Sequence, residues 1–376
     1  QIFYFLLSTI YFLLSTIYFL LSTFYFLLST FYFLLSTFYF LLSTFCTSPF
    51  PEIGVLMHYD VFNGDADGII ALVQLRLAEP KESMLVTGVK RDIKLLGKFA
   101  SSDDVTSVTA LDISMEKNRE ALITLLNNGV SVFYCDHHRS GDIPQSDELE
   151  ALIDLDAETC TSLLINQKLG GKFAKWAVAA AFGDNLHSSA KKLASELGLS
   201  PEDTHFLEEL GTLINYNGYG GSLADLHIAP AELYRKLLAF PCPLMLREDP
   251  SSPFYVLKAG YAEDYFHISH LKPTADSEVS AVYELPNEAW ARRISGVFGN
   301  DLANAQPNKA HAVITLNQSG ADYTVSVRAP LNNRIGADEI CSAFPTGGGR
   351  KAAAGINQLP LADKEKFIQT LTSFYA

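Results

Sequence analysis

The sequence predicts an α/β protein, with a doubly wound parallel sheet in an N-terminal domain, a smaller α/β C-terminal domain, and a cleft between the two. From Met57 onward, short apolar runs alternate with longer runs of helical period, which is typical of parallel βαβ units. Three of the apolar runs stop at an acidic residue or a histidine. The carboxyl ends of parallel strands form one rim, where open α/β sheets bind ligands, so we expect these side chains to gather there.

The elements of the N-terminal domain follow from hydrophobic period and helix-end signals. Ser114 is expected to cap a helix that Gly129 closes. A Gly/Asn/Tyr stretch at 215–221 predicts a loop at a domain connection. The expected strands are 58–62, 84–89, 105–111 and 130–135, and the expected helices are 68–77, 114–127, 161–169, 173–182, 188–197, 201–213 and 230–240.

Around Val279 the pattern changes to a second α/β domain. Strands are expected at 280–284, 311–316 and 323–328, and helices at 335–344, 350–354 and 361–374. The chain then divides into a low-complexity repeat (1–52), a first domain (53–213), connecting helices and linker (214–275), and a substrate-binding domain (276–376).

The first 45 residues repeat one heptapeptide, in which Tyr-Phe-Leu-Leu-Ser-Thr recurs from Tyr4 to Tyr39. A transmembrane span, a signal peptide and a coiled coil each fit poorly, because the run is too long for one span, has no basic flank, and is apolar at nearly every position. We favour a repeated DNA tract translated upstream of the true start at Met57, the first methionine. Mass spectrometry that finds a repeat peptide in the native protein would contradict this.

Composition limits the partners. The net charge of −14 argues against binding long duplex DNA, which is usually held by a basic surface. Short oligonucleotides and nucleotides remain compatible, because bound divalent ions would reverse the sign of the field in a cleft. The five cysteines are scattered without a C-x-x-C pair, so free thiols in the reducing cytoplasm are expected, with no disulfide framework. No membrane partner is expected either. A homodimer is compatible with the sequence.

Carboxylates and imidazoles that could bind divalent ions follow the strands. Asp65 and Asp67 lie in a glycine-flanked turn after the first strand, behind the neutral oxygen of Asn63. A turn that only caps a helix would explain them alone, but further such residues follow the other strands. These are Asp112 after the third strand, the run Asp136-His137-His138 after the fourth, and Asp184 after an apolar helix, with Asp154 and Asp156 as competitors for the role of Asp184. Oxygen ligands with an added imidazole suit Mn²⁺ or Mg²⁺.

Phosphate-binding candidates lie in the second domain. Arg328 ends an expected strand, and the glycines Gly347, Gly348 and Gly349 precede Arg350 in a loop that is expected to enter a helix. Free amides at a helix N-terminus bind anions, and Arg grips phosphate with two parallel hydrogen bonds.

Together these motifs resemble the DHH phosphoesterase family, from about Met57 to the C-terminus. The turn from Asn63 to Gly68, then Asp112, then Asp136-His137-His138 and then Asp184 resemble its four motifs, and the C-terminal part resembles the DHH-associated domain. Two positions depart from the family pattern. Asn63 stands where a His or Asp is usual, and Arg350 stands where a His is usual; Arg cannot shuttle a proton near neutral pH.

The resemblance implies a hydrolase with two Mn²⁺ ions, or Mg²⁺ in their place. Asp65, Asp67, Asp112, His137 and Asp184 would bind the ions, Asp112 would bridge them, Asp136 would orient its neighbours, and His138 would face the phosphate. The expected substrate is a short oligonucleotide or nucleotide. A pyrophosphatase or exopolyphosphatase and a catalytically impaired nucleotide-binding protein are the alternatives.

Overall fold

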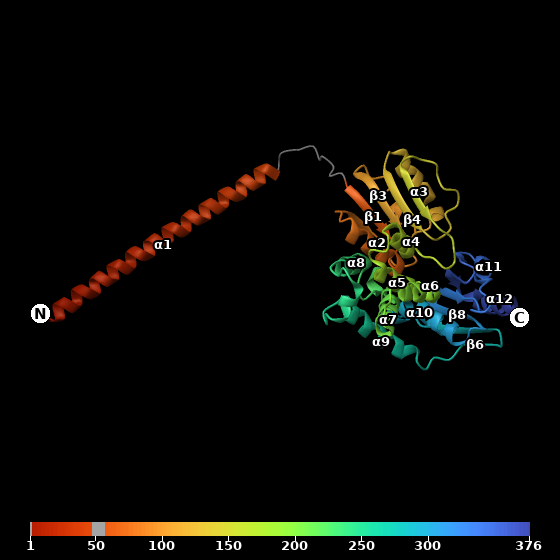
Figure 1. Cartoon of the computed structure of the whole chain (residues 1–376). Coiled ribbons are helices and arrows are strands. Elements are labelled where there is room, and N and C mark those ends of the chain that lie inside the picture. The colour runs from red at the N-terminus through yellow and green to blue at the C-terminus, as the bar shows by residue number, and fades with distance from the viewer. Residues whose placement is uncertain (1, 47–56) are drawn as a thin grey trace. The chain divides into compact units, whose positions relative to one another are not determined.

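The computed structural model describes residues 2–46 and 57–376. By its contacts the chain divides into two units, Gln1–Val55 and Leu56–Ala376 (Figure 1). The two units are described separately below.

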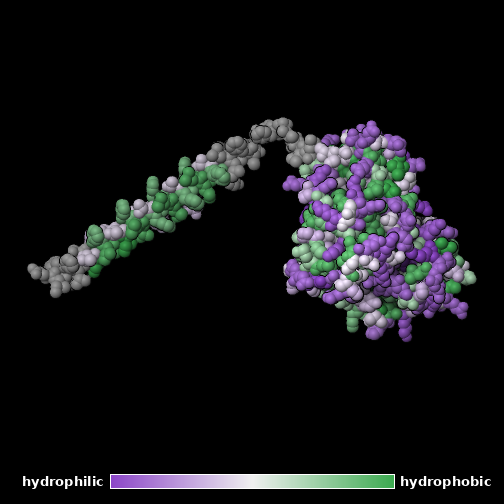
Figure 2. Space-filling view, in the orientation of Figure 1, coloured by the Kyte–Doolittle hydropathy of each residue, from purple (hydrophilic) through white to green (hydrophobic). Residues whose placement is uncertain are grey.

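The heptapeptide repeat forms one helix, α1 (Ile2–Cys46). Its hydroxyl groups bond within the helix: Ser15 and Thr16 both donate to the Phe12 carbonyl at 2.8 Å, and the later repeats do the same. The aromatic and leucine side chains of residues 9–38 are exposed. Figure 2 shows the apolar colouring of the face of α1 turned toward the viewer. By length and composition only, Thr9–Phe38 could cross a membrane.

The second unit begins with a five-stranded parallel sheet. Its strands are β1 (Met57–Phe62), β2 (Met84–Val86), β3 (Val105–Leu111), β4 (Ser131–Asp136) and β5 (Leu149–Ile153), in the order β2-β1-β3-β4-β5. The chain therefore moves from β1 to β2 on one side and returns to β3 on the other. Ligands bind at such a reversal, outside the carboxyl ends of the strands. The doubly wound parallel sheet predicted from the sequence is confirmed.

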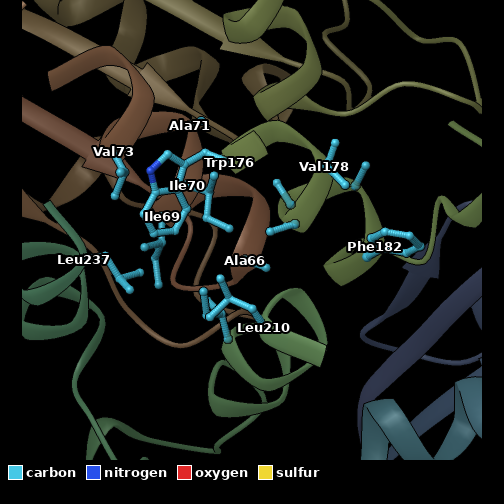
Figure 3. Close-up of a cluster of buried hydrophobic side chains, with 14 of the residues drawn as sticks. Ala66, Ile69, Ile70, Ala71, Val73, Trp176, Val178, Phe182, Leu210 and Leu237 are labelled. Carbon is cyan, nitrogen blue, oxygen red and sulfur yellow. The ribbon is translucent and has the colours of Figure 1, made fainter. Parts of the chain in front are cut away.

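Alternation along the strands supplies a core on each face of this sheet. Phe62, Leu111 and Cys135 pack with α2 (Ala66–Ala78), α4 (Thr161–Lys168), α5 (Ala174–Gly183) and α7 (Pro201–Asn217). Figure 3 shows part of this core, with Ile69 and Ile70 of α2 beside Trp176 of α5. The other face, with Val61 and Val108, packs against α3 (Met115–Asn127) and the short helix Leu96–Lys98. The remaining helices of this part are α6 (His187–Glu196), α8 (Pro230–Leu238) and α9 (Pro253–Ile268).

The second sheet is mixed and has six strands in the order β10-β11-β9-β8-β7-β6. Only β7 and β8 pair in parallel. The long helix α10 (Ala289–Ala305) packs on one side of it, and α11 (Ala337–Ser342) and α12 (Lys364–Tyr375) contribute to the core on the other. The strands are β6 (Ala275–Asp276), β7 (Ser280–Leu285), β8 (Ala310–Leu316), β9 (Asp322–Arg328), β10 (Gly347–Gly349) and β11 (Ala353–Pro360).

Two sequence predictions about local structure are wrong. The helix expected at 350–354 does not form: Gly347–Gly349 and Ala353–Pro360 make an antiparallel hairpin with Arg350 in its turn. Pairing of Ala353 and Ala354 with Arg328 and Val327 of β9 overrides the helical preference of the alanines. The loop expected at 215–221 starts later, because α7 continues to Asn217. Sequence analysis also missed β5, α9 and α10.

The cysteine prediction holds for the described side chains. Cys135, Cys160, Cys242 and Cys341 are free thiols, and all but Cys242 are buried. The side chain of Cys46 lies outside the described part of the chain.

Candidate metal centre

The turn after β1 places Asp65 at the N-terminus of α2. Its Oδ1 accepts hydrogen bonds from the backbone N–H groups of Asp67 at 3.0 Å and Gly68 at 3.1 Å, which caps the helix. Gly64 is needed for close approach, because a Cβ there would lie 1.8 Å from the carbonyl oxygen of Gly88. The helix-capping alternative considered for this turn is therefore real for Asp65, while its second oxygen, Oδ2, faces the site.

Asp67 points from the first turn of α2 to the N-terminus of α4. Its two carboxylate oxygens accept hydrogen bonds of 2.7 Å from the backbone N–H groups of Thr161 and Ser162. The Ser162 hydroxyl donates to the Asp67 carbonyl at 2.8 Å. These contacts fix a buried carboxylate with its remaining lone pairs directed toward the end of β4. Burial raises the pKa of Asp67, and the neighbouring carboxylates of Asp184 and Asp65 raise it further, although His137 opposes them.

Asp112 follows β3 in a left-handed backbone conformation, with φ of 58°. Aspartate tolerates this region better than most residues. Its Oδ1 accepts a hydrogen bond from the Thr161 hydroxyl at 3.2 Å. Burial, together with the charges of Asp65 and Asp67, raises the pKa of Asp112 well above its ordinary value. A cation in the site would remove this penalty, since an opposite charge stabilises the ionised form.

His137 lies at the centre of the carboxylates. Its Nδ1 is 3.0 Å from the carbonyl oxygen of Thr159, which can only accept a proton, so Nδ1 carries the hydrogen. Its Nε2 then faces carboxylate oxygens of Asp112 at 3.5 Å, Asp67 at 3.8 Å and Asp184 at 3.8 Å. An imidazole nitrogen surrounded by carboxylate oxygens is the donor set that a divalent ion binds, and the Thr159 carbonyl on the other side of the ring fixes its orientation.

His138 turns the other way and is bonded to Asp136. Its Nδ1 lies 2.7 Å from Asp136 Oδ1 and 3.7 Å from Asp112 Oδ1. Asp136 is fully buried, and its Oδ2 has no hydrogen-bond partner among the described residues. The side chain of His138 is 32% exposed, so it can meet a bound molecule while Asp136 holds its ring.

Asp184 reaches the site from the end of α5. Close packing of two helices puts it there: a Cβ on Gly211 of α7 would lie 1.9 Å from the Ala179 carbonyl oxygen of α5. Its buried Oδ2 has no hydrogen-bond partner within the described chain, although Arg350 Nη1 lies 3.6 Å away. The competitors Asp154 and Asp156 are exposed and bond to backbone amides two residues on.

These donors fit a divalent ion. Ligand atoms of Asp112, His137 and His138 lie within 4.8 Å of one another. Asp67 and Asp184 border the same space through their contacts with His137. Buried carboxylates with unused oxygens, beside an imidazole nitrogen, match the oxygen-and-nitrogen ligand set of Mn²⁺ or Mg²⁺.

Asn63 and Lys90 lie beside the centre. Asn63 Nδ2 donates to the Lys90 carbonyl at 3.3 Å, and its buried Oδ1 has no partner in the described residues. Lys90 was missed by sequence analysis. Its Nζ lies 2.6 Å from Asp65 Oδ2, and although burial opposes the shift, this ammonium lowers the pKa of Asp65 to about 2. Lys90 directly follows the strand expected at 84–89, although β2 itself ends at Val86, so inspection of residues after expected strands could have found it.

From the second domain, Arg350 contacts a residue of the centre, Asp184, whereas Arg328 donates hydrogen bonds to residues of its own domain. Burial opposes the shift, but Arg350 and then His137 lower the pKa of Asp184. Arg328 bonds within its own domain, through Nε to Asn300 Oδ1 at 2.6 Å and through Nη2 to the Gly296 carbonyl at 3.2 Å. The predicted anion cradle of free amides at a helix N-terminus is wrong, because Gly347, Gly348 and Gly349 form strand β10, paired with β11.

The fold is similar to that of solved DHH-domain proteins. The structure is similar to a DHH domain described as belonging to a member of a family of ribosomal proteins, with a TM-score of 0.59 and 14% identity over 85% of this chain and 86% of that one. It is also similar to exonuclease RecJ bound to manganese, with a TM-score of 0.51 and 18% identity over 85% of this chain and 90% of that one.

A pGpG-specific phosphodiesterase from Vibrio cholerae gives a TM-score of 0.51 and 13% identity over 85% of this chain and 98% of that one. No protein-family model and no curated protein matches the sequence. At these identities the likeness establishes the fold, and it confirms at that level the resemblance that the motifs predicted.

Proposed function

We propose that this protein is a divalent-metal-dependent phosphoesterase that hydrolyses phosphodiester bonds of short oligonucleotides or nucleotides. The observation that carries the proposal is the environment of His137. One ring nitrogen is fixed on a backbone carbonyl, and the other faces Asp67, Asp112 and Asp184 within 3.8 Å. Such a set holds a divalent ion, and a bound ion supplies an ionised water and neutralises phosphate charge.

The residues around this set suit a phosphate ester. Arg350 lies 3.6 Å from Asp184 and, with Asp184 drawn to a metal ion, would have its guanidinium free to hold a phosphate oxygen. His138 lies on the exposed side of the same centre, held by Asp136 at 2.7 Å. We assign His138 the role of facing the phosphate and Asp136 the role of orienting it. Arg350 then supplies a positive charge, and His138 an imidazole nitrogen, where a phosphate would enter.

The substrate class is supported by what similar structures are named for. RecJ is described as an exonuclease and was solved with manganese, and the Vibrio protein is described as a phosphodiesterase specific for pGpG. Both act on phosphodiester bonds of nucleotides or nucleic acid. The overall charge of −14 favours a short substrate over long duplex DNA.

The test is to offer the protein a dinucleotide, a cyclic dinucleotide, pyrophosphate and polyphosphate with Mn²⁺. Release of mononucleotide from a dinucleotide is expected, and its loss on adding EDTA would show that it needs metal. Orthophosphate from pyrophosphate or polyphosphate alone would replace the proposal with the phosphatase alternative. Binding of a nucleotide without turnover would favour the impaired, nucleotide-binding alternative that Asn63 and Arg350 suggested.

A further inference from the structure

A lysine ammonium already lies among the carboxylates of the metal centre. Lys90 Nζ is 2.6 Å from Asp65 Oδ2 and 4.0 Å from Asp184 Oδ1. Its side chain is 22% exposed, and those of Asp65 and Asp184 are 4% and 8% exposed. The ammonium therefore lies inside the site, on the side formed by Asp65.

Contacts with neutral groups hold Lys90 in this position. Its Nζ donates to Asn215 Oδ1 at 2.8 Å and lies 5.2 Å from the centroid of the Tyr219 ring. Its backbone N–H donates to the Gly218 carbonyl at 2.8 Å, and its own carbonyl accepts from Asn63. Because these groups are neutral, a metal ion that binds the carboxylates would leave the contacts of Lys90 with Asn215, Tyr219 and Gly218 in place. A flexible surface lysine attracted only by negative charge would have no such set.

Asp65 has both carboxylate oxygens engaged away from His137. Oδ1 caps α2 through the backbone amides of Asp67 and Gly68, and Oδ2 pairs with Lys90. Among the described residues, His137 Nε2 has ion-pair contacts with Asp67, Asp112 and Asp184, and none with Asp65. The centre thus has an imidazole with three carboxylates on one side and Asp65 with an ammonium on the other, and the side chains of Asp65 and Asp112 interact where the two sides adjoin.

We propose that Lys90 is a resident cation that fills the Asp65 half of the site, so that the protein binds one divalent ion, through Asp67, Asp112, His137 and Asp184, and not two. The inference rests on the proposed metal-dependent function and departs from the two-ion cluster that the family resemblance implied. Ions in two-metal sites lie about 3.5–4 Å apart and share carboxylates. Lys90 shares a carboxylate with the neighbouring half, because Asp184 faces the ammonium with Oδ1 and His137 with Oδ2. A second dication there would be repelled by the fixed ammonium.

Metal stoichiometry tests this inference without a substrate. The metal-free full chain is dialysed against Mn²⁺, bound manganese is counted by mass spectrometry of the metal, and the electron paramagnetic resonance spectrum is recorded. The variant Lys90→Met removes the charge at similar length. Lys94→Met is the matched control, because Lys94 is an exposed lysine four residues along the chain.

We expect one ion per chain in the wild type and in Lys94→Met, with the spectrum of an isolated Mn²⁺. We expect two ions in Lys90→Met, with the spectrum of a spin-coupled pair. Two ions in the wild type would overturn the inference and leave the phosphoesterase proposal intact. One ion in folded Lys90→Met would also overturn it, since Lys90 would then not set the count.

Lys90→Arg provides a check that does not depend on how well Lys90→Met folds. It keeps the positive charge, so one ion is expected, and two would contradict the role of the charge. A wild type that binds no manganese would refute the metal-dependent function itself and this inference with it. Hydrolysis of a dinucleotide by a two-ion wild type would refute only the inference.

Discussion

The Nδ1 atom of His137 lies 3.0 Å from the carbonyl oxygen of Thr159, and this single contact fixes the tautomer of the central imidazole. Because the carbonyl accepts the Nδ1 proton, Nε2 is the ring atom that faces the carboxylates and is left to bind an ion. Thr159 was not among the residues expected from the sequence. Thr159 acts through its backbone carbonyl, two residues before the first residue of α4, so no pattern of side chains in the sequence identifies it.

We expect His137→Ala to abolish manganese binding and hydrolysis while the fold persists. Changes to residues that only support a metal ligand typically lower affinity 10–100-fold, so loss of the ligand itself should lower it by about 100-fold or more. Metal content, turnover and far-ultraviolet circular dichroism are the measurements. His205→Ala is the control, because the His205 side chain is 80% exposed. Retained manganese in His137→Ala would remove His137 from the centre.

Asp112→Asn should stabilise the metal-free protein and prevent metal binding. The pKa of Asp112 is raised by burial and by Asp65 and Asp67, so the folded protein prefers its protonated form. Ionisation of Asp112 destabilises the folded protein. This loss of stability is absent below 3.8, the pKa of Asp112 in the unfolded chain, and it grows as pH rises from there toward the higher pKa of Asp112 in the folded protein. At pH 7 the neutral amide, which also tolerates φ of 58°, should add about 0.5–2 kcal/mol to the free energy of unfolding.

Thermal unfolding with and without Mn²⁺ measures both effects of Asp112→Asn. The variant should unfold at a higher temperature than the wild type in EDTA, and Mn²⁺ should raise its midpoint less. Asp147→Asn, at an exposed position, is the control and should match the wild type. A lower midpoint for Asp112→Asn in EDTA would show that its charge does not destabilise the empty site.

Asp136→Asn should slow turnover by about 10–100-fold with little change in metal content. Asp136 bonds His138 at 2.7 Å and does not face His137 Nε2, so it positions a ring and does not bind the ion. The measurements are kcat, its pH profile and bound manganese. The pH profile should move with the substitution, since the charge beside His138 is lost. Loss of manganese along with turnover would instead make Asp136 part of the metal centre.

Arg350→Gln should raise KM about tenfold or more and leave metal content unchanged. A hydrogen bond to a charged group contributes about 1.5–3 kcal/mol, which corresponds to a tenfold or larger change in affinity. Arg350 lies beside Asp184, whereas its neighbour Lys351 is exposed and has no ion pair among the described residues. Lys351→Gln is therefore the matched control. An equal rise in KM in both variants would point to a general effect of charge.

Gly211→Ala should destabilise the fold by about 1–3 kcal/mol and weaken metal binding, because a Cβ there would lie 1.9 Å from the Ala179 carbonyl oxygen. Separation of α5 from α7 would displace Asp184. Gly97→Ala is the control, because in the described structure no other atom lies within 4 Å of the added Cβ. Urea unfolding and manganese titration of both variants measure the effect, and equal stability would show that the helices have room to move.

Strand ends were predictable because the period of apolar residues along a strand is a local property of the sequence. β3 was predicted to its observed bounds, and the turn after β1, Asp112 and Asp136-His137-His138 were placed at the rim by the parallel arrangement alone. The choice of Asp184 over Asp154 and Asp156 followed from family resemblance. The structure supplies a physical reason for its position, which is the glycine contact between α5 and α7.

The second domain shows where local sequence failed. The alanines after Arg350 favour a helix, yet Ala353 and Ala354 pair with β9, so the glycines form a strand and Arg350 lies at a hairpin turn. Sheet pairing is a nonlocal interaction, and its gain in hydrogen bonds and burial exceeds the small helical preference of alanine.

The sequence by itself determined the doubly wound sheet and the carboxylates and imidazoles at its rim, because both depend on short periods and on strand ends. Only the tertiary structure decided how these groups face one another: that Thr159 orients His137, that Arg350 contacts Asp184, and that Lys90 lies against Asp65. The physical reason is that charges interact over a few ångströms of space, and residues that meet at those distances here are separated by up to 166 positions along the chain, from Asp184 to Arg350.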